Sequence, residues 1–156
     1  MLNSLIKSIA KVFGGNKSER DVQQLLPVVD KVNEWFEEYN SLTHDQLRAK
    51  TIELKQRIDD GLADIDAQID AIKSEIEKLT ADDVIEKDDH YSNIEKLEKD
   101  RDVQLEKILL EILPESFAVV KQTAKRFSEN ESIEVVATPF DVELSKSKSN
   151  VRITGD

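Results

Sequence analysis

Apolar residues recur through the middle of the chain at steps of four and three, which is the period of a helix seam buried against another helix. The stripe covers residues 45–79 and consists of Leu47, Thr51, Leu54, Ile58, Leu62, Ile65, Ile69, Ile72, Ile76 and Leu79. As one helix, this stretch would be roughly 50 Å long at about 1.5 Å per residue. Because a helix cannot cover its own stripe, the pattern requires a partner helix.

The next periodic segment supplies that partner, returning antiparallel after a polar tip at residues 80–91. Its apolar positions are Ile94, Leu97, Leu105, Ile108 and Ile112. Arg101 interrupts this line, and we expect its stem to lie on the seam while its charge stays outside. Gly61 lies inside the first stripe without shifting the phase, so the first helix should continue through it, bent at most. The expected architecture is a long antiparallel coiled-coil hairpin, inserted at about residues 59–108.

Three capping boxes mark predicted helix starts. They are Ser18 with Asp21, Thr43 with Gln46, and Ser92 with Glu95. The first opens a helix whose apolar stripe is Val22, Leu25, Val29, Val32, Phe36 and Tyr39. Pro27 lies inside this stripe and should kink the helix or mark its first turn. Trp35 flanks the stripe, where a packing anchor is favoured over a ligand platform.

Beyond the hairpin, the sequence predicts first a further helix and then short strands. Pro114 should end or kink the returning helix and begin a last one at residues 115–128, which completes a helical region at residues 17–128. That last helix would bury Phe117, Val120, Ala124 and Phe127. Later apolar residues alternate or cluster like short strands: Ile133, Val135, Val136, Phe140, Val142, Leu144, Val151 and Ile153. Residues 129–156 are therefore expected to be a β-prone or disordered tail, an incomplete unit.

Residues 1–16 form a separate unit, a predicted amphipathic helix followed by a hinge at Gly14 and Gly15. The candidate membrane-binding residues are Leu2, Leu5, Ile6, Lys7, Ile9, Lys11, Val12 and Phe13. A basic amphipathic helix suits an anionic membrane surface or a groove on a partner. The alternative is that its apolar face packs on its own domain, and the residues leave both interpretations open.

Composition favours extended helices over a large core, because 35% of the residues are charged and only 5% are aromatic. With no cysteine, disulfides and thiolate metal sites are excluded. The net charge of −11 means that the chain as a whole repels nucleic acid and anionic lipid, although residues 1–20 are basic. Residues 59–107 are dense in Asp and Glu, and a solvated face is favoured there over a basic partner. No run approaches the roughly 18 apolar residues of a membrane span, and Lys7 and Lys11 interrupt any signal-peptide core, so a cytoplasmic protein is expected.

Candidate chemistry is sparse. His44 and His90 lie far apart in the sequence, which disfavours a zinc site or a nucleophile with its base. Acidic pairs such as Asp88 and Asp89 fit a solvated charge run better than a calcium site, because EF-hand spacing is absent. There is no GxxxxGK[ST] phosphate loop. We therefore predict no catalytic residue, no cofactor-binding residue and no metal ligand.

Two strings resemble a known family. LTHDQLRAKTIELKQRI, at residues 42–58, is similar to the LSDEELRAKTxEFRxRL element of the SecA preprotein translocase ATPase. LLEILPESFAVVKQTAKRF, at residues 109–127, resembles that family's LLPEAFAVVREASKR element. The order also agrees: the amphipathic start is followed by a basic joint at residues 16–20 and by Val28, Val29, Val32 and Asn33, which resemble the family's VVxxIN, before the first string. Together these segments cover about half of the chain.

The resemblance implies the N-terminal part of a motor that uses ATP and magnesium to drive preproteins through the SecYEG channel. The family's phosphate loop, TGEGKT, does not occur here, so this piece should not hydrolyse ATP alone. It would contribute docking on the channel and on anionic lipid, at the inner membrane, and structural support. In most members of the family only a short loop stands where this chain places residues 62–108.

The residues also fit a rival interpretation, a free-standing coiled-coil adaptor that binds membranes and protein partners. The seam itself leaves a homodimer open, because a self-paired hairpin and an intermolecular four-helix bundle use the same apolar positions.

Overall fold

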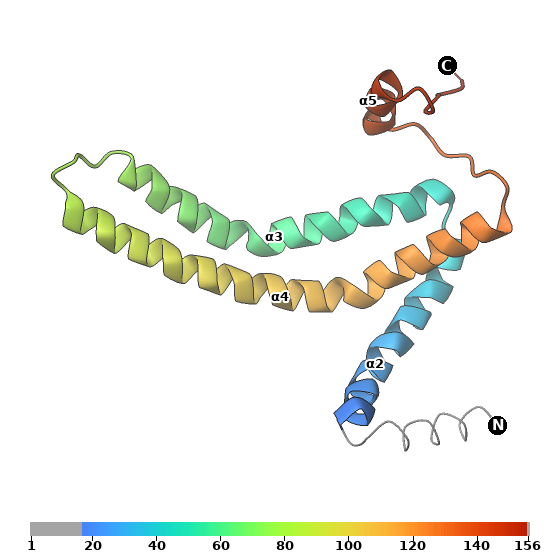
Figure 1. Ribbon diagram of the computed structural model, residues 1–156, viewed down its shortest axis with the longest axis horizontal. Coiled ribbons are helices and arrows are strands. Elements are labelled where there is room, and N and C mark those ends of the chain that lie inside the picture. Colours follow the sequence, from blue (N-terminus) through green and yellow to red (C-terminus); the bar gives the residue numbers. More distant parts are fainter. Residues whose placement is uncertain (1–16, 156) are drawn as a thin grey trace.

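Residues 17–155 are described by the computed structural model, and they are mainly α-helical, as predicted, with no strand among them. The elements are α2 (Lys17–Glu38), the 3-10 helix η1 (Tyr39–Ser41), α3 (His44–Ile76), α4 (Val84–Glu129) and α5 (Pro139–Ser147). Helices α3 and α4 run antiparallel and form a long arm, while α2 packs against the other end of α4 (Figure 1). The arm therefore projects away from a small body in which α2, α3 and α4 meet.

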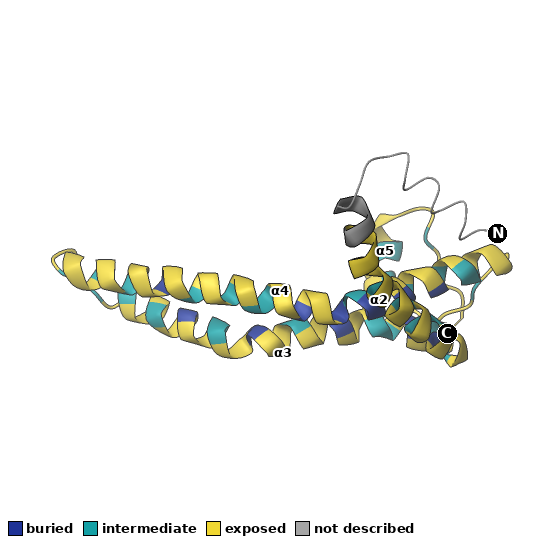
Figure 2. Cartoon of the chain, turned by 90° about the horizontal axis from the view of Figure 1, so that it is seen from below, coloured by how far each residue is buried: buried dark blue, intermediate teal, exposed yellow. Residues whose placement is uncertain are grey.

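The seam of the arm is the predicted one. Leu54, Leu62 and Ile69 of α3 are buried, as are Ile94, Ile108 and Ile112 of α4. In Figure 2, dark blue and teal patches follow the line between α3 and α4, whereas the outer faces of both helices are yellow. Thr43 caps α3 as predicted: its side chain accepts a hydrogen bond from the Gln46 amide, and the Gln46 side chain accepts one from the Thr43 amide. The α3–α4 hairpin is therefore correctly anticipated by the apolar period.

Gly61 marks a close approach of the two helices. Helix α3 continues through it, as predicted. A Cβ atom at this position would lie 2.5 Å from Cδ1 and 3.3 Å from Cγ1 of Ile108 in α4. The glycine therefore makes room for a buried side chain of the partner helix, which explains why a poor helix former stands inside the seam.

The tip of the arm is shorter than predicted. Helix α4 begins at Val84, so Ser92 lies inside it and its expected capping box with Glu95 is wrong. The Asp83 carboxylate accepts hydrogen bonds from the Thr80 amide at 2.8 Å and the Thr80 hydroxyl at 2.7 Å. These bonds close the turn earlier than the sequence suggested, because an Asp side chain that satisfies nearby backbone donors favours a turn.

Both interior prolines are absorbed into helices. Pro27 lies inside α2, and Pro114 lies inside α4, which runs unbroken to Glu129. The separate last helix predicted at residues 115–128 is therefore wrong. Figure 1 shows α4 changing direction in its last third, the kink expected of a helix that loses one hydrogen bond to a proline. Pro114 is itself buried.

The predicted burial of this last segment is also wrong. Phe117, Val120 and Phe127 are 56%, 66% and 68% exposed, and Ala124 is exposed. Glu115, Ala118 and Gln122 occupy the buried face instead. The start of the α2 stripe behaves alike, with Val22, Leu25 and Val29 exposed at 55%, 59% and 49%, whereas Tyr39 at its end is buried. The apolar period correctly identifies residues that share one side of a helix. It does not show whether other described residues cover that side.

The tail carries a helix where strands were predicted. Thr138 caps α5: its hydroxyl accepts from the Asp141 amide, and the Asp141 carboxylate accepts from the Thr138 amide at 2.8 Å. Pro139 then occupies the first turn, where a missing amide hydrogen costs nothing. The strands expected around Ile133, Phe140 and Val151 are therefore absent from the described residues, because a complete capping box outweighs a short alternation of apolar residues.

Candidate functional site

The body of the molecule is a junction of three helices at the root of the arm. Tyr39, Leu47 and Ala118 form its buried centre, at 1%, 4% and 0% exposure. Trp35, Phe36, Leu42 and Val119 pack around them, so Trp35 is a packing residue as predicted. These side chains come from α2, η1, α3 and α4, and they fix where the arm leaves the body. We call this set the root.

A buried carboxylate ties the elements of the root together. The Tyr39 hydroxyl donates to Oε1 of Glu115 at 2.5 Å, and Nη1 of Arg57 donates to Oε2 at 2.5 Å. Glu115 is only 6% exposed, so its charge needs both partners. Burial and the bond to Glu115 raise the pKa of the Tyr39 hydroxyl, which therefore stays protonated. We call this arrangement the Glu115 clasp: it joins η1, α3 and α4 through one side chain.

Two further side chains of α4 satisfy the end of α2 and η1. Gln122, at 1% exposure, donates from Nε2 to the Phe36 carbonyl at 2.6 Å and to the Asn40 side chain at 2.9 Å. Nη2 of Arg126 donates to the carbonyls of Tyr39 and Leu42 at 2.9 and 2.8 Å. Carbonyls at a helix end lack intrahelical donors, and here α4 supplies them. The root is thus held by polar bonds as well as by its apolar centre.

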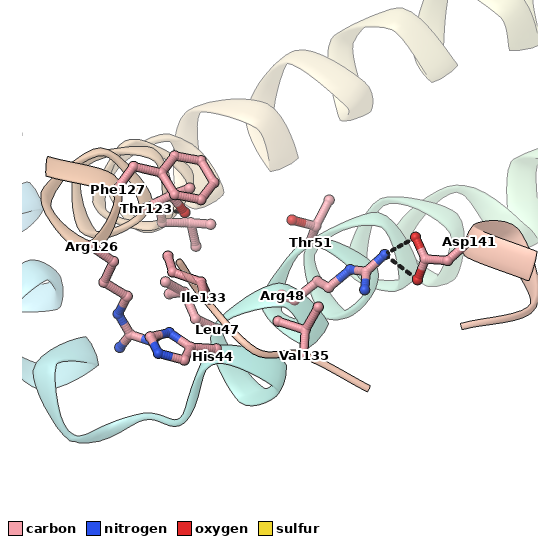
Figure 3. A pocket seen from close by; sticks show the side chains of 11 residues that line it. His44, Leu47, Arg48, Thr51, Thr123, Arg126, Phe127, Ile133, Val135 and Asp141 are labelled. Atoms are coloured by element: carbon pink, nitrogen blue, oxygen red, sulfur yellow. Dashed lines mark hydrogen bonds and ion pairs between the residues drawn. The ribbon is translucent and has the colours of Figure 1, made fainter. Parts of the chain in front are cut away.

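A cavity of about 420 Å³ opens beside the root, between α3, α4 and the segment that leads into α5 (Figure 3). It is lined by His44, Leu47, Arg48, Thr51, Val119, Thr123, Arg126, Phe127, Ile133, Val135 and Asp141. Arg48 closes one side, where Nη2 donates to both carboxylate oxygens of Asp141 at 2.6 and 2.7 Å. The Val136 amide also donates to Asp45, at 3.0 Å. These bonds hold residues 133–141 across the start of α3, and we call this segment with its bonds the strap.

The strap depends on an ionised carboxylate. The bond from the Arg48 guanidinium and the bonds from Thr138 lower the pKa of Asp141 well below its ordinary value. The same carboxylate therefore caps α5 and holds Arg48.

The lining of the cavity offers no evident centre for catalysis. His44 Nδ1 lies 3.2 Å from Nη1 of Arg126, not beside a nucleophile. His90 lies at the tip of the arm, 3.8 Å from Glu75 and 4.0 Å from Glu86. In residues 17–155, no three His, Cys, Asp or Glu side chains gather in a way that could hold a metal ion.

Sequence reasoning found part of this site. Arg101 lies across the seam as expected, and its charge meets Asp66 of α3, with Nε donating to Oδ1 at 2.5 Å. The clasp and the Gln122 bonds were missed. The available signal was the presence of Glu115 and Gln122 within an otherwise apolar helix face, but their partners lie far away in the sequence. The predicted membrane-binding residues, Leu2 to Phe13, lie outside the described residues.

The two strings that carry the family resemblance meet at the root. The first supplies Leu47 to the root and Arg57 to the Glu115 clasp, and the second supplies Ala118 to the root and Glu115 to the clasp. No helix within residues 17–155 is long and apolar enough to cross a membrane.

Comparison with known proteins matches nearly the whole chain to one family. The family model of the SecA DEAD-like domain matches residues 9–146. The protein translocase subunit SecA of Flavobacterium psychrophilum is 44% identical over 98% of this chain, and that of Cytophaga hutchinsonii is 44% identical over 94%. The SecA subunit of Porphyromonas gingivalis is 41% identical over 95%. These matches extend across the arm, so residues 62–108 are shared with these relatives.

The chain spans only 13–14% of the length of these relatives. No solved structure matches it. Since the family model covers most of the chain and the resemblance of both strings is confirmed, the chain belongs to the SecA protein translocase family.

Proposed function

We propose that this chain acts in protein translocation as a bracing and docking segment of a SecA-type motor. The motor would use ATP and magnesium to move preproteins through the SecYEG channel. The chain has no GxxxxGK[ST] phosphate loop. No step of hydrolysis is assigned to it, and its part is structural.

The observation that carries this proposal is an exposed apolar face on α4. Leu110, Phe117, Val120 and Phe127 are 63%, 56%, 66% and 68% exposed. Their spacing of seven, three and seven places them on one side of the helix, away from the side that carries Glu115 and Gln122. Covering a large apolar side chain stabilises a contact by about 1.5–3 kcal/mol. Such a face is suited to packing against another part of the translocase. We call this proposed contact, made by Leu110, Phe117, Val120 and Phe127, the seat.

The clasp makes that face suitable for bracing. Glu115 lies between Leu110 and Phe117 along α4 and holds the helix to η1 and α3. The apolar face therefore moves as one piece with the root and the arm. A contact made there would fix the direction in which the arm points.

A trans-complementation experiment tests the seat. The chain is mixed with the Flavobacterium psychrophilum subunit from which the matched span has been deleted, and complex formation is followed by sedimentation velocity. We expect a one-to-one complex that is lost in the double variant Phe117→Asp, Val120→Asp. The matched control is Val103→Asp, which adds a charge at a site that is 69% exposed on the arm, outside the seat and away from the tip. Equal binding by both variants would refute the seat.

Membrane docking is assigned to residues 1–16. Lys7 and Lys11 would meet lipid phosphates while the apolar residues Leu2, Leu5, Ile6, Ile9, Val12 and Phe13 enter the headgroup boundary. Attraction is worth about 1 kcal/mol per basic residue near an anionic surface, so binding would be reversible and salt-sensitive. Co-sedimentation with anionic and neutral liposomes tests this. We expect anionic liposomes to bind more chain, and equal binding to both would remove the assignment. Such binding would place the protein peripherally at the inner membrane.

A further inference from the structure

The tip of the arm, residues 75–91, presents apolar side chains that nothing in the described residues covers. Val84, Ile85 and Tyr91 are 66%, 82% and 57% exposed on the first turns of α4. Val84 and Tyr91 are seven positions apart and share one side of the helix, with Ile85 on the next row. Large apolar residues at such exposure, grouped at the end of a projecting element, indicate a contact surface.

The charge around this surface defines what it would attract. Residues 75–91 hold seven Asp and Glu residues against two lysines, a formal charge of −5 out of −11 for the whole chain. Asp88 and Asp89 lie between Ile85 and Tyr91 along α4, so carboxylates and apolar side chains alternate on its surface. Anionic lipid and nucleic acid would be repelled, whereas a cationic surface would be attracted.

The arm is built to hold this tip at a fixed distance from the body. From the clasp at Arg57 to the end of α3 at Ile76, the helix extends about 30 Å at about 1.5 Å per residue. The seam, the close approach at Gly61 and the Arg101–Asp66 ion pair couple the two helices along that length. The tip lies at the opposite end of the molecule from α2 and α5 (Figure 1). It is therefore free to meet a second molecule while the body stays seated.

We propose that the tip docks a lysine- or arginine-rich amphipathic segment of another polypeptide. The apolar side of that segment would cover Val84, Ile85 and Tyr91, and its cations would meet Asp88, Asp89 and the neighbouring carboxylates. Exposed ion pairs are individually weak and are screened by salt. The binding therefore depends on both kinds of contact, which distinguishes it from general attraction to an acidic surface.

A peptide-binding measurement tests the proposal. The probe is a designed helical peptide with leucines along one face and lysines along the other, labelled for fluorescence anisotropy, and its counterpart has every lysine replaced by glutamine. We expect saturable binding of the lysine peptide only. Two tip variants, Val84→Ser with Ile85→Ser and Asp88→Asn with Asp89→Asn, should each raise the Kd by about tenfold or more.

Matched controls lie further along α4, at exposed positions away from the tip. Val103→Ser removes an apolar side chain that is 69% exposed, and Glu98→Gln with Asp102→Asn removes two charges. These should leave the Kd within about twofold. If the control charge variant weakens binding as much as the tip charge variant, or if the lysine peptide does not bind, the proposal is overturned. Because the tip variants leave Phe117 and Val120 intact, loss of tip binding is separable from loss of the seat on the translocase.

Discussion

Replacing Gly61 with alanine sets two effects of opposite sign against each other near the root of the arm. Alanine stabilises a helix interior by about 1 kcal/mol relative to glycine. The added Cβ would, however, lie 2.5 Å from Cδ1 of Ile108, a contact that requires one group to move. Ile108 is buried at 7% exposure and packs with Leu54, Leu62 and Ile112, so it has little room to yield.

The expected magnitude follows from these two terms. Overpacking a buried site costs roughly 1–3 kcal/mol, so the net change in the free energy of unfolding should be between about 0 and −2 kcal/mol. In an Ile108→Val background Cδ1 is absent and only the 3.3 Å approach to Cγ1 remains, so the same substitution should stabilise by up to about 1 kcal/mol. Ile108→Val alone should cost about 0.5–1.5 kcal/mol. The two positions are therefore expected to couple by up to about 3 kcal/mol.

Urea unfolding followed by far-ultraviolet circular dichroism measures all four members of this cycle. Ala63→Gly, at an exposed position two residues along α3, gives the bare helix-propensity difference as a control. If Gly61→Ala stabilises equally in both backgrounds, the two helices are free to separate at this point. The explanation of Gly61 as a packing residue would then be refuted.

Three further predictions concern the polar bonds of the body. Glu115→Gln should lower the free energy of unfolding by about 2–3 kcal/mol, measured by urea unfolding, whereas Glu111→Gln on the exposed side should change it by less than about 0.5 kcal/mol. The pKa of Tyr39 is raised in the folded chain. The Tyr39 hydroxyl therefore contributes stability below its ordinary pKa of 10.0, and this contribution is lost as the pH rises above that value. In unfolding measured as a function of pH, Tyr39→Phe should remove this part of the alkaline loss of stability. The pKa of Asp141 is lowered, so the bonds that hold residues 133–141 to α3 should be stable above the ordinary pKa of 3.8 and should open as the pH falls below that value. The Thr138 amide should then lose its protection from hydrogen exchange. Continued protection at low pH would contradict this prediction.

The parts of the fold that follow from local or periodic rules could be predicted from the sequence. The seam requires only a repeated spacing, and the Thr43 cap requires only a partner three residues away. The tail could have been predicted by the same rule, because Thr138 and Asp141 stand at the same spacing, but the alternation of apolar residues beside them favoured strands. The Glu115 clasp is different in kind. Arg57 and Glu115 are separated by 58 positions in the sequence, and Tyr39 and Glu115 by 76. No local spacing reveals such pairs before the helices are placed.

The exposed face of α4 shows why one prediction of burial was wrong. Phe117, Val120 and Phe127 have the helical spacing of a core face, and that spacing is real. Glu115 and Gln122 nevertheless occupy the buried side, because the elements that surround the root offer a tyrosine, an arginine and free carbonyls. Such a helix has a polar buried side and an apolar exposed side. Burial of the exposed apolar side chains against another surface would be favourable, and this driving force is not used within the described residues. Under the proposed function, this driving force is directed at another part of the translocase. The root would then orient the face, and the arm would project from the seated body toward a second partner.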